Sequence, residues 1–141
     1  MKKQQVDSLL MIDDDDLWLM MNTIVIDRSQ AVNTVVQAKS GALALRFLEQ
    51  SKDDWPQIIF CDIQMPIMNG WEFFDQYYER FDQNRDRSML CMLSSSQNEI
   101  DRQYFIERSY LSMYLTKPLN PQQLEEVIHY YQNEFKLKTT G

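Results

Sequence analysis

The chain has 141 residues, with 14 basic and 21 acidic side chains, and its formal net charge is −7 at neutral pH. This length predicts a single domain over residues 1–141, with a core at about residues 5–137 and short loose ends. The 44% hydrophobic fraction and 25% charged fraction are typical of a globular protein and argue against disorder. The acidic balance disfavours nucleic acid or an anionic membrane as a partner, since both need a basic surface.

The apolar segments point to a protein that stays outside membranes. No apolar run approaches the ~18 residues that a membrane-spanning helix requires, and the stretch before the first aspartates is too short for a signal peptide. Cys61 and Cys91 each lie in an apolar, strand-like run. We expect both to be buried free thiols in a reducing compartment, where disulfides are rare. The expected location is therefore cytoplasmic.

Strand-like and helix-like patterns alternate along the whole chain. The expected strands are apolar runs, at Ser8–Ile12, Asn33–Lys39, Gln57–Cys61, Met89–Leu93 and Leu111–Leu115. The expected helices follow these strands, and three of them are at Asp16–Asp27, about Trp71 to Phe81, and Asn98–Ser109. Another begins after Ser40, which is a plausible N-cap. The last begins after Asn120 as N-cap, with Pro121 in the first helical position and Gln123 in a capping box. Nearly continuous apolar strands indicate a parallel sheet covered on both faces. The sequence thus predicts a doubly wound α/β domain with five strands and five helices.

Polar residues follow the expected strands at their carboxyl ends, where ligands bind in open α/β sheets. They are Asp13 to Asp16 after the first strand, Asp62 after the third, Ser94 to Ser96 after the fourth and Lys117 after the fifth. Carboxylates brought together repel unless they share a proton or a cation, and a few carboxylates with water suit Mg²⁺. A lysine and a hydroxyl can stabilise a phosphoryl group in transfer, and a carboxylate can accept it. The set predicts phosphoryl transfer onto an aspartate, without a glycine-rich nucleotide loop.

Four blocks of this sequence resemble the receiver domain of two-component response regulators. They are Leu9–Asp14, Ile59–Pro66 with Asn69 and Gly70, Met92–Ser95, and Tyr114–Pro118. The similarity covers roughly Gln5 to the last helix, in the family's order and spacing. It implies a flavodoxin-like, three-layer fold with strand order 2-1-3-4-5 and a cis peptide bond between Lys117 and Pro118.

The resemblance also implies a metal site and a phosphoacceptor. Asp62 would accept the phosphoryl group and contribute to Mg²⁺ binding. Asp14 would be a direct carboxylate ligand of Mg²⁺, and Asp13 would act mostly through water. The backbone carbonyl of Gln64 would complete the protein's share of the ligands.

Further positions match the family's switch and lifetime residues. Ser94 would hydrogen-bond the phosphoryl group, and Lys117 would pair with it. Tyr114 would be the aromatic switch residue, whose ring turns inward when Ser94 moves toward the phosphate. Gln64 and Ser96 would line the path of the hydrolytic water and thereby set the lifetime of the aspartyl phosphate.

Other noticeable residues have simpler interpretations. Asp15 and Asp16 are expected to cap a helix and to lie on its solvated surface. His129, the single histidine, is expected to be a solvated or half-packed helix residue, so the donor histidine would lie on another protein. The three tryptophans are expected to pack against the core.

The leading hypothesis is a stand-alone receiver that accepts a phosphoryl group from phosphohistidine onto Asp62 and catalyses only its own phosphorylation and dephosphorylation. Its expected partners are a sensor histidine kinase or a histidine phosphotransfer protein, and a downstream protein bound by the fourth helix, fifth strand and fifth helix. It would be a monomer or a phosphorylation-dependent dimer. Two alternatives stay open. A haloacid-dehalogenase-like phosphatase would use Asp13 as nucleophile, and a binding module with the receiver fold would not be phosphorylated at all.

Overall fold

A computed structural model describes residues 5–95 and 98–137 of the chain. Strands and helices alternate along it, as β1 (Val6–Ile12), α1 (Asp16–Ser29), β2 (Val32–Ala38), α2 (Gly41–Glu49), β3 (Ile58–Cys61), α3 (Gly70–Arg80), β4 (Met89–Ser94), α4 (Glu99–Glu107), β5 (Met113–Thr116) and α5 (Pro121–Tyr130). The five strands form one parallel sheet in the order β2-β1-β3-β4-β5. The predicted fold class and strand order are therefore confirmed.

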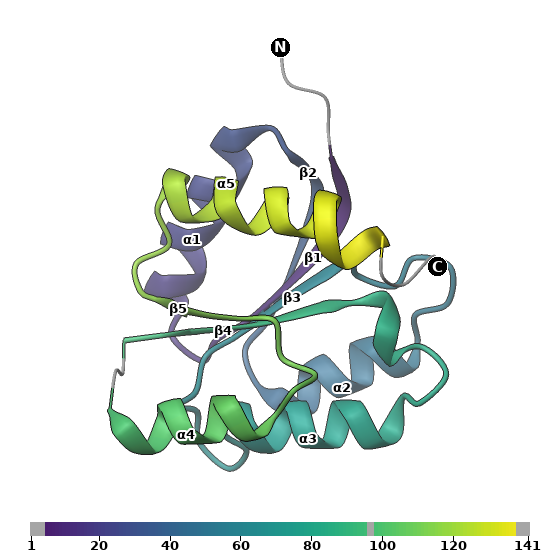
Figure 1. Cartoon of the computed structure of the whole chain (residues 1–141), viewed down its shortest axis with the longest axis vertical. Coiled ribbons are helices and arrows are strands. Elements are labelled where there is room, and N and C mark those ends of the chain that lie inside the picture. The colour runs from purple at the N-terminus through teal and green to yellow at the C-terminus, as the bar shows by residue number, and fades with distance from the viewer. Residues whose placement is uncertain (1–4, 96–97, 138–141) are drawn as a thin grey trace.

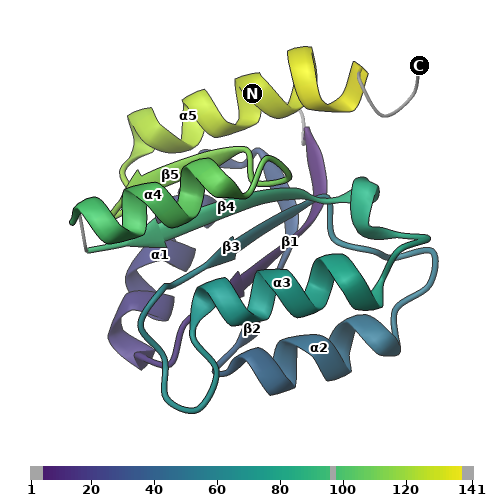
Figure 2. The ribbon, with the colours of Figure 1, turned by 60° about the horizontal axis from the view of Figure 1, so that its bottom comes forward.

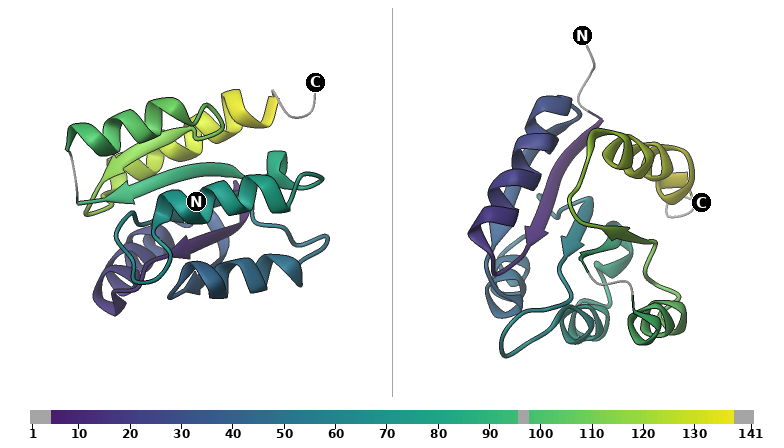
Figure 3. Two further views of the ribbon diagram at one scale, coloured as in Figure 1. Left: turned by 90° about the horizontal axis from the view of Figure 1, so that it is seen from below. Right: turned by 90° about the vertical axis from the view of Figure 1, so that its left-hand side faces the viewer.

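Helices cover both faces of this sheet. α1 and α5 lie over one face, and α2, α3 and α4 lie over the other (Figures 1 and 3). α2 and α3 run side by side along their face (Figure 2). This three-layer arrangement leaves the two ends of the sheet for loops, and the loops after the strands gather at one end.

The inner strands of the sheet are apolar where helices cover both of its faces. In β1, Leu9 and Met11 enter the core beneath α1 and α5, whereas Leu10 and Ile12 enter the core beneath α2 and α3. Successive side chains of a strand point to opposite faces, so a strand buried on both faces has no polar position. β3 is buried in the same way at all four residues.

The helix starts follow the capping residues in the sequence. The side chains of Asp15, Ser40 and Asn120 each accept a backbone N–H in the first turn of the following helix. Asn120 and Gln123 form the predicted capping box, with Pro121 in the first helical position. These contacts fix where each helix begins, which matters most for α1 because it starts beside the site described below.

Several boundaries differ from the sequence-based expectations by one or two residues, as where β1 begins at Val6 rather than Ser8 and α4 ends at Glu107 rather than Ser109. The fifth strand begins at Met113, not Leu111, because the Leu111 N–H donates to the Arg108 carbonyl in a turn after α4. The last helix is α-helical to Tyr130 and continues as a π-helical turn, η2 (Tyr131–Phe135). A 3₁₀ turn, η1 (Arg85–Arg87), was not expected.

Expectations about thiols and membranes can also be compared with the structure. Cys61 and Cys91 are both buried and free, as predicted. Among residues 5–95 and 98–137, no helix is long and apolar enough to cross a bilayer. His129 is exposed on α5, and Trp55 and Trp71 are buried in the core, also as predicted.

Candidate functional site

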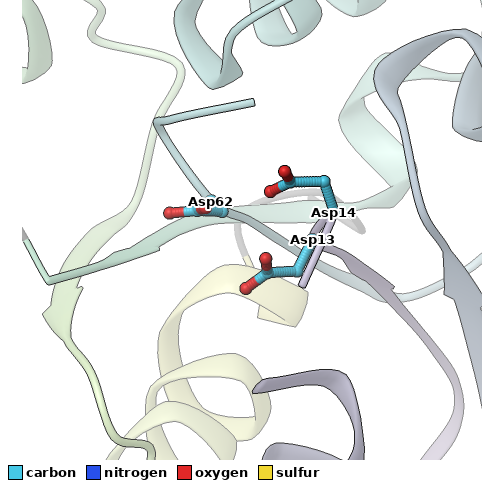
Figure 4. Close-up of side chains that lie close together, drawn as sticks. All are labelled: Asp13, Asp14 and Asp62. Carbon is cyan, nitrogen blue, oxygen red and sulfur yellow. The ribbon is translucent and has the colours of Figure 1, made fainter. Parts of the chain in front are cut away.

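Three carboxylates meet where β1 and β3 end (Figure 4). Ile12 of β1 pairs in register with Cys61 of β3, so the residues that follow leave the sheet side by side. Asp13, Asp14 and Asp62 each offer one oxygen, and these oxygens lie within 4.8 Å of one another. Asp13 and Asp62 are buried, whereas Asp14 is exposed. Oxygen ligands at this spacing, one of them open to water, suit a hard divalent cation such as Mg²⁺.

Lys117 brings a positive charge to this group from the loop after β5. Its Nζ lies 2.5 Å from Oδ2 of Asp13 and 3.5 Å from Oδ1 of Asp62, and its side chain is only 3% exposed. A buried ammonium requires such partners, because an unpaired buried charge is strongly destabilising. The Lys117–Pro118 peptide bond is cis, as the resemblance implies. The site therefore combines three carboxylates with one enclosed cation.

Asp13 is held on both of its oxygens. Oδ1 accepts the backbone N–H of Asp15 at 3.0 Å, and Oδ2 accepts Nζ of Lys117. Asp62 is also contacted by the protein, through Lys117 and the backbone of Ile63, so the exposed Asp14 is the carboxylate of the three that is most open to a metal ion. That Asp13 would act mostly through water stays a prediction.

The surroundings of Asp62 disfavour the ionised form of its carboxyl group. Burial, followed by the charge of Asp13, raises the pKa of Asp62 from 3.8 to about 6, although Lys117 acts in the opposite direction. Burial penalises the ionised form, and a neighbouring like charge penalises it further. A cation or a new covalent bond at Asp62 would relieve this penalty.

The loop after β3 is folded tightly behind Asp62. The Gly70 N–H donates to the Ile63 carbonyl at 2.8 Å, and a Cβ on Gly70 would lie only 2.3 Å from the Asp62 carbonyl oxygen. Only glycine permits this approach. At the tip of the loop, the fully exposed Ile67 has a φ of 72°, which is rare for a β-branched residue. Gln64 lies at the start of the loop and is exposed.

The predicted switch residues lie on the neighbouring strands. Ser94 is buried at the end of β4, and its carbonyl accepts the Lys117 N–H at 2.9 Å. Tyr114 of β5 is half-buried between α3 and α4, with ring centroids 6.5 Å from Trp71 and 5.7 Å from Phe105. Ser96 lies outside the described residues.

Two features near the site were missed at the level of sequence. The ring of Trp18 lies over Lys117, with its centroid 4.8 Å from Nζ, although the three tryptophans were all interpreted as packing. Asp101 of α4 is buried and accepts the indole N–H of Trp71 at 3.1 Å. No local signal marks either contact, because each joins residues that are far apart in the chain.

Comparisons with known proteins agree with this architecture. The sequence matches the model of the response regulator receiver domain over residues 9–129. An uncharacterized 14.6 kDa protein in the sodA1 3′ region of Leptolyngbya boryana is 29% identical over 127 residues, which cover 90% of each chain. Hybrid signal transduction histidine kinase I of Dictyostelium discoideum is 34% identical over 94 residues, which are 65% of this chain and 5% of that protein.

Solved structures show the same similarity in three dimensions. A two-component response regulator from Cytophaga hutchinsonii superimposes with a TM-score of 0.86 at 33% identity, covering 94% of this chain and all of the other. A response regulator receiver protein from Dyadobacter fermentans gives a TM-score of 0.79 at 25% identity, covering 89% and 97%. Since the family match spans most of the chain, this protein belongs to the response regulator receiver domain family.

Proposed function

We propose that the protein is a Mg²⁺-dependent phosphoacceptor, which takes a phosphoryl group from a phosphohistidine onto Asp62. The observation that carries this proposal is the meeting of Asp13, Asp14 and Asp62 within 4.8 Å, with Lys117 in contact with two of them. Asp14, Asp62 and the backbone carbonyl of Gln64 would hold the cation, and Asp13 would act through water. Mg²⁺, when bound, supplies positive charge that offsets the carboxylates and the phosphoryl oxygens.

The proposed step is an in-line transfer between two acceptors. A carboxylate oxygen of Asp62 attacks phosphorus, the P–N bond to the donor imidazole breaks, and the leaving nitrogen takes up a proton from solvent. Lys117 and Ser94 stabilise charge on the phosphoryl oxygens, which is the main contribution that a protein makes to this chemistry. Hydrolysis of the acyl phosphate later returns Asp62 to a free carboxylate. The protein thus catalyses only its own phosphorylation and dephosphorylation.

The proposed output is a change in the surface formed by α4, β5 and α5. Phosphorylation adds about one negative charge at the site, against Ser94 and Lys117. Tyr114 connects this end of the sheet to α4, because its ring packs between Trp71 and Phe105. A groove of about 460 Å³ beside Tyr114, between α4 and β5, offers a place for a downstream protein.

The proposed phosphodonor is a histidine kinase or a histidine phosphotransfer protein that contacts α1. One side of α1 exposes an apolar stripe at helical spacing, formed by Leu17, Met20, Met21 and Ile24, each between 39% and 56% exposed. Exposed apolar patches commonly mark protein contacts, and this stripe begins three residues after Asp14. We expect Met20→Asp to slow transfer from a phosphorylated histidine phosphotransfer protein while leaving phosphorylation by acetyl phosphate unchanged.

One experiment separates this proposal from both alternatives. The protein is incubated with Mg²⁺ and acetyl phosphate, and the phosphorylated residue is located by mass spectrometry, with Asp62→Asn and Asp13→Asn as matched variants. Label on Asp62 that is absent from Asp62→Asn supports the receiver function. Label on Asp13 would instead indicate a phosphatase of the haloacid-dehalogenase type. If neither acetyl phosphate nor beryllofluoride modified the site, only a binding module would be left.

The proposal also covers the lifetime of the phosphorylated form and the location of the protein. Substituting Gln64 and Ser96 by other residues should change the lifetime of the phosphorylated form while leaving Mg²⁺ affinity nearly unchanged. A cytoplasmic location belongs to the same proposal, supported by the two free thiols, Cys61 and Cys91. Size-exclusion chromatography with and without beryllofluoride tests whether phosphorylation converts a monomer to a dimer.

A further inference from the structure

The Lys117 ammonium is enclosed on three sides, and only two of these sides are charged. Asp13 and Asp62 supply the carboxylates, and the indole ring of Trp18 supplies the third side, with its centroid 4.8 Å from Nζ. The face of an indole carries negative electrostatic potential and attracts an ammonium within about 6 Å. Because the Lys117 side chain is 3% exposed, this contact takes place where little water competes.

The position of Trp18 is fixed by the way α1 meets the loop after β5. Asp15 caps α1 by accepting the Leu17 N–H, which sets the register of the first turn. Trp18 and Asn22 are four residues apart and so lie on one side of the helix. Asn22 is buried, and its Oδ1 accepts the Leu119 N–H at 3.3 Å. The same side of α1 therefore contacts this loop twice, at Leu119 through Asn22 and at Lys117 through Trp18.

The alternative, that Trp18 merely fills space, explains less of this geometry. An aliphatic side chain that only packs would offer no negative potential to the ammonium, whereas the indole presents the face of its ring to Nζ. The indole adds attraction for the cation without adding a net charge. A carboxylate at this place would instead compete with Asp13 and Asp62 for the ammonium.

We propose that Trp18 is a positioning residue for phosphoryl transfer, which holds the Lys117 ammonium toward Asp13 and Asp62 and keeps water from its outer side. The inference rests on the proposed function of Asp62 as phosphoacceptor. Removing the ring would leave Lys117 in place but less restrained. Its stabilisation of the phosphoryl oxygens would then weaken, and the rate of Asp62 phosphorylation would fall.

The test compares Trp18→Leu and Trp18→Phe, each alone and combined with Lys117→Met. The initial rate of phosphorylation by acetyl phosphate is measured at fixed Mg²⁺. Trp18→Leu should lower this rate about 2- to 30-fold, the range that corresponds to a cation–π contact. Trp18→Phe, which keeps an aromatic face, should lower it less. Neither change should lower the rate further in the Lys117→Met background, because the residue through which Trp18 acts is then gone.

A second measurement reports on the contact without activity. Nuclei above an aromatic ring are shielded, so the side-chain methylene signals of Lys117 should lie upfield of those of the other six lysines in NMR spectra of the wild-type protein. Lys117→Met assigns the signal. The upfield position should be lost in Trp18→Leu and partly kept in Trp18→Phe.

The outcomes distinguish the inference from the proposed function. If wild-type Asp62 is labelled but Trp18→Leu reacts within twofold of it, the inference is wrong and the proposed function stands. An equal loss of rate in the Lys117→Met background would also overturn it, because Trp18 would then act on the shape of the site. If the wild-type chain is never labelled at Asp62, the proposed function itself fails.

Discussion

Replacing Asp62 by asparagine should stabilise the metal-free protein at neutral pH, even though it removes the proposed phosphoacceptor. Burial and the charge of Asp13 raise the pKa of Asp62 to about 6, against its ordinary value of 3.8. The difference is about two pKa units, and at about 1.4 kcal/mol for each unit the ionised group costs about 3 kcal/mol of folding free energy. Asparagine keeps the shape of the side chain and cannot ionise, while Lys117 keeps its contact with Asp13.

The pH dependence follows from which state binds the proton more tightly. The native protein holds the Asp62 proton up to about pH 6, whereas the unfolded chain releases it near pH 4, so wild-type stability falls as pH rises between these values. Below about pH 3 both states are largely protonated, and the advantage of Asp62→Asn should be close to zero. It should grow to its full size, about 3 kcal/mol, above about pH 7.

The assay is urea unfolding followed by tryptophan fluorescence, in a buffer with chelator and then with Mg²⁺. Asp14→Asn is the matched control, because Asp14 belongs to the same carboxylate group but is exposed, and its effect without metal should stay within about 0.5 kcal/mol. Mg²⁺ should stabilise the wild-type protein by mass action and should stabilise Asp62→Asn much less. The reasoning is refuted if Asp62→Asn is less stable than wild type in chelator at neutral pH, or if the difference does not change with pH.

Three other substitutions test the surroundings of the site by the same unfolding assay. Trp71→Phe removes a donor to the buried Asp101 carboxylate, and its control, Trp55→Phe, removes a hydrogen bond to a neutral tyrosine hydroxyl. Trp71→Phe should lower the free energy of unfolding more, because hydrogen bonds to charged groups contribute about 1.5–3 kcal/mol and neutral ones about 1 kcal/mol. Equal losses in the two variants would contradict this. Ile67→Gly should raise stability by about 1 kcal/mol, since it relieves a positive φ without removing buried contacts, and a decrease would show that the loop is not strained. Gly70→Ala should destabilise the protein by about 1–3 kcal/mol, because the new Cβ meets the carbonyl oxygen of the proposed phosphoacceptor; a neutral effect would mean that this loop adjusts easily.

The location of the site could be predicted from the sequence for a physical reason, whereas the order of the strands came from the resemblance to the receiver family. β3 and the second half of β1, Leu9–Ile12, are buried on both faces of the sheet, so their residues form uninterrupted apolar runs. Parallel strands all end at the same side of the sheet. Any polar residue that directly follows such a run, as Asp13 and Asp62 do, is therefore brought to one place.

The side-chain contacts that orient the site could not be predicted from the sequence in the same way. The sequence offers Trp18 as one apolar residue among several on α1, and nothing local shows that its ring faces a cation rather than the core. That contact depends on how α1 packs against a loop that begins about 100 residues later, at Lys117. The bond between Trp71 and Asp101 likewise joins two helices, α3 and α4, whose relative position the local pattern does not determine. Capping residues such as Asp15 were predictable because their partners lie two or three residues away.

The net charge of −7 acquires a specific meaning at this site. Asp13, Asp14 and Asp62 contribute three negative charges and Lys117 contributes one positive charge, so the net charge of these four side chains is near −2 above about pH 7. A divalent cation would bring this group close to neutral, and an incoming phosphoryl group would then meet much less repulsion. The balance depends on Lys117 staying near the carboxylates, because a displaced ammonium would leave a buried carboxylate without its partner. An uncharged aromatic ring at Trp18 restrains the ammonium without altering that balance, which is why we expect the identity of this residue to affect transfer more than its size.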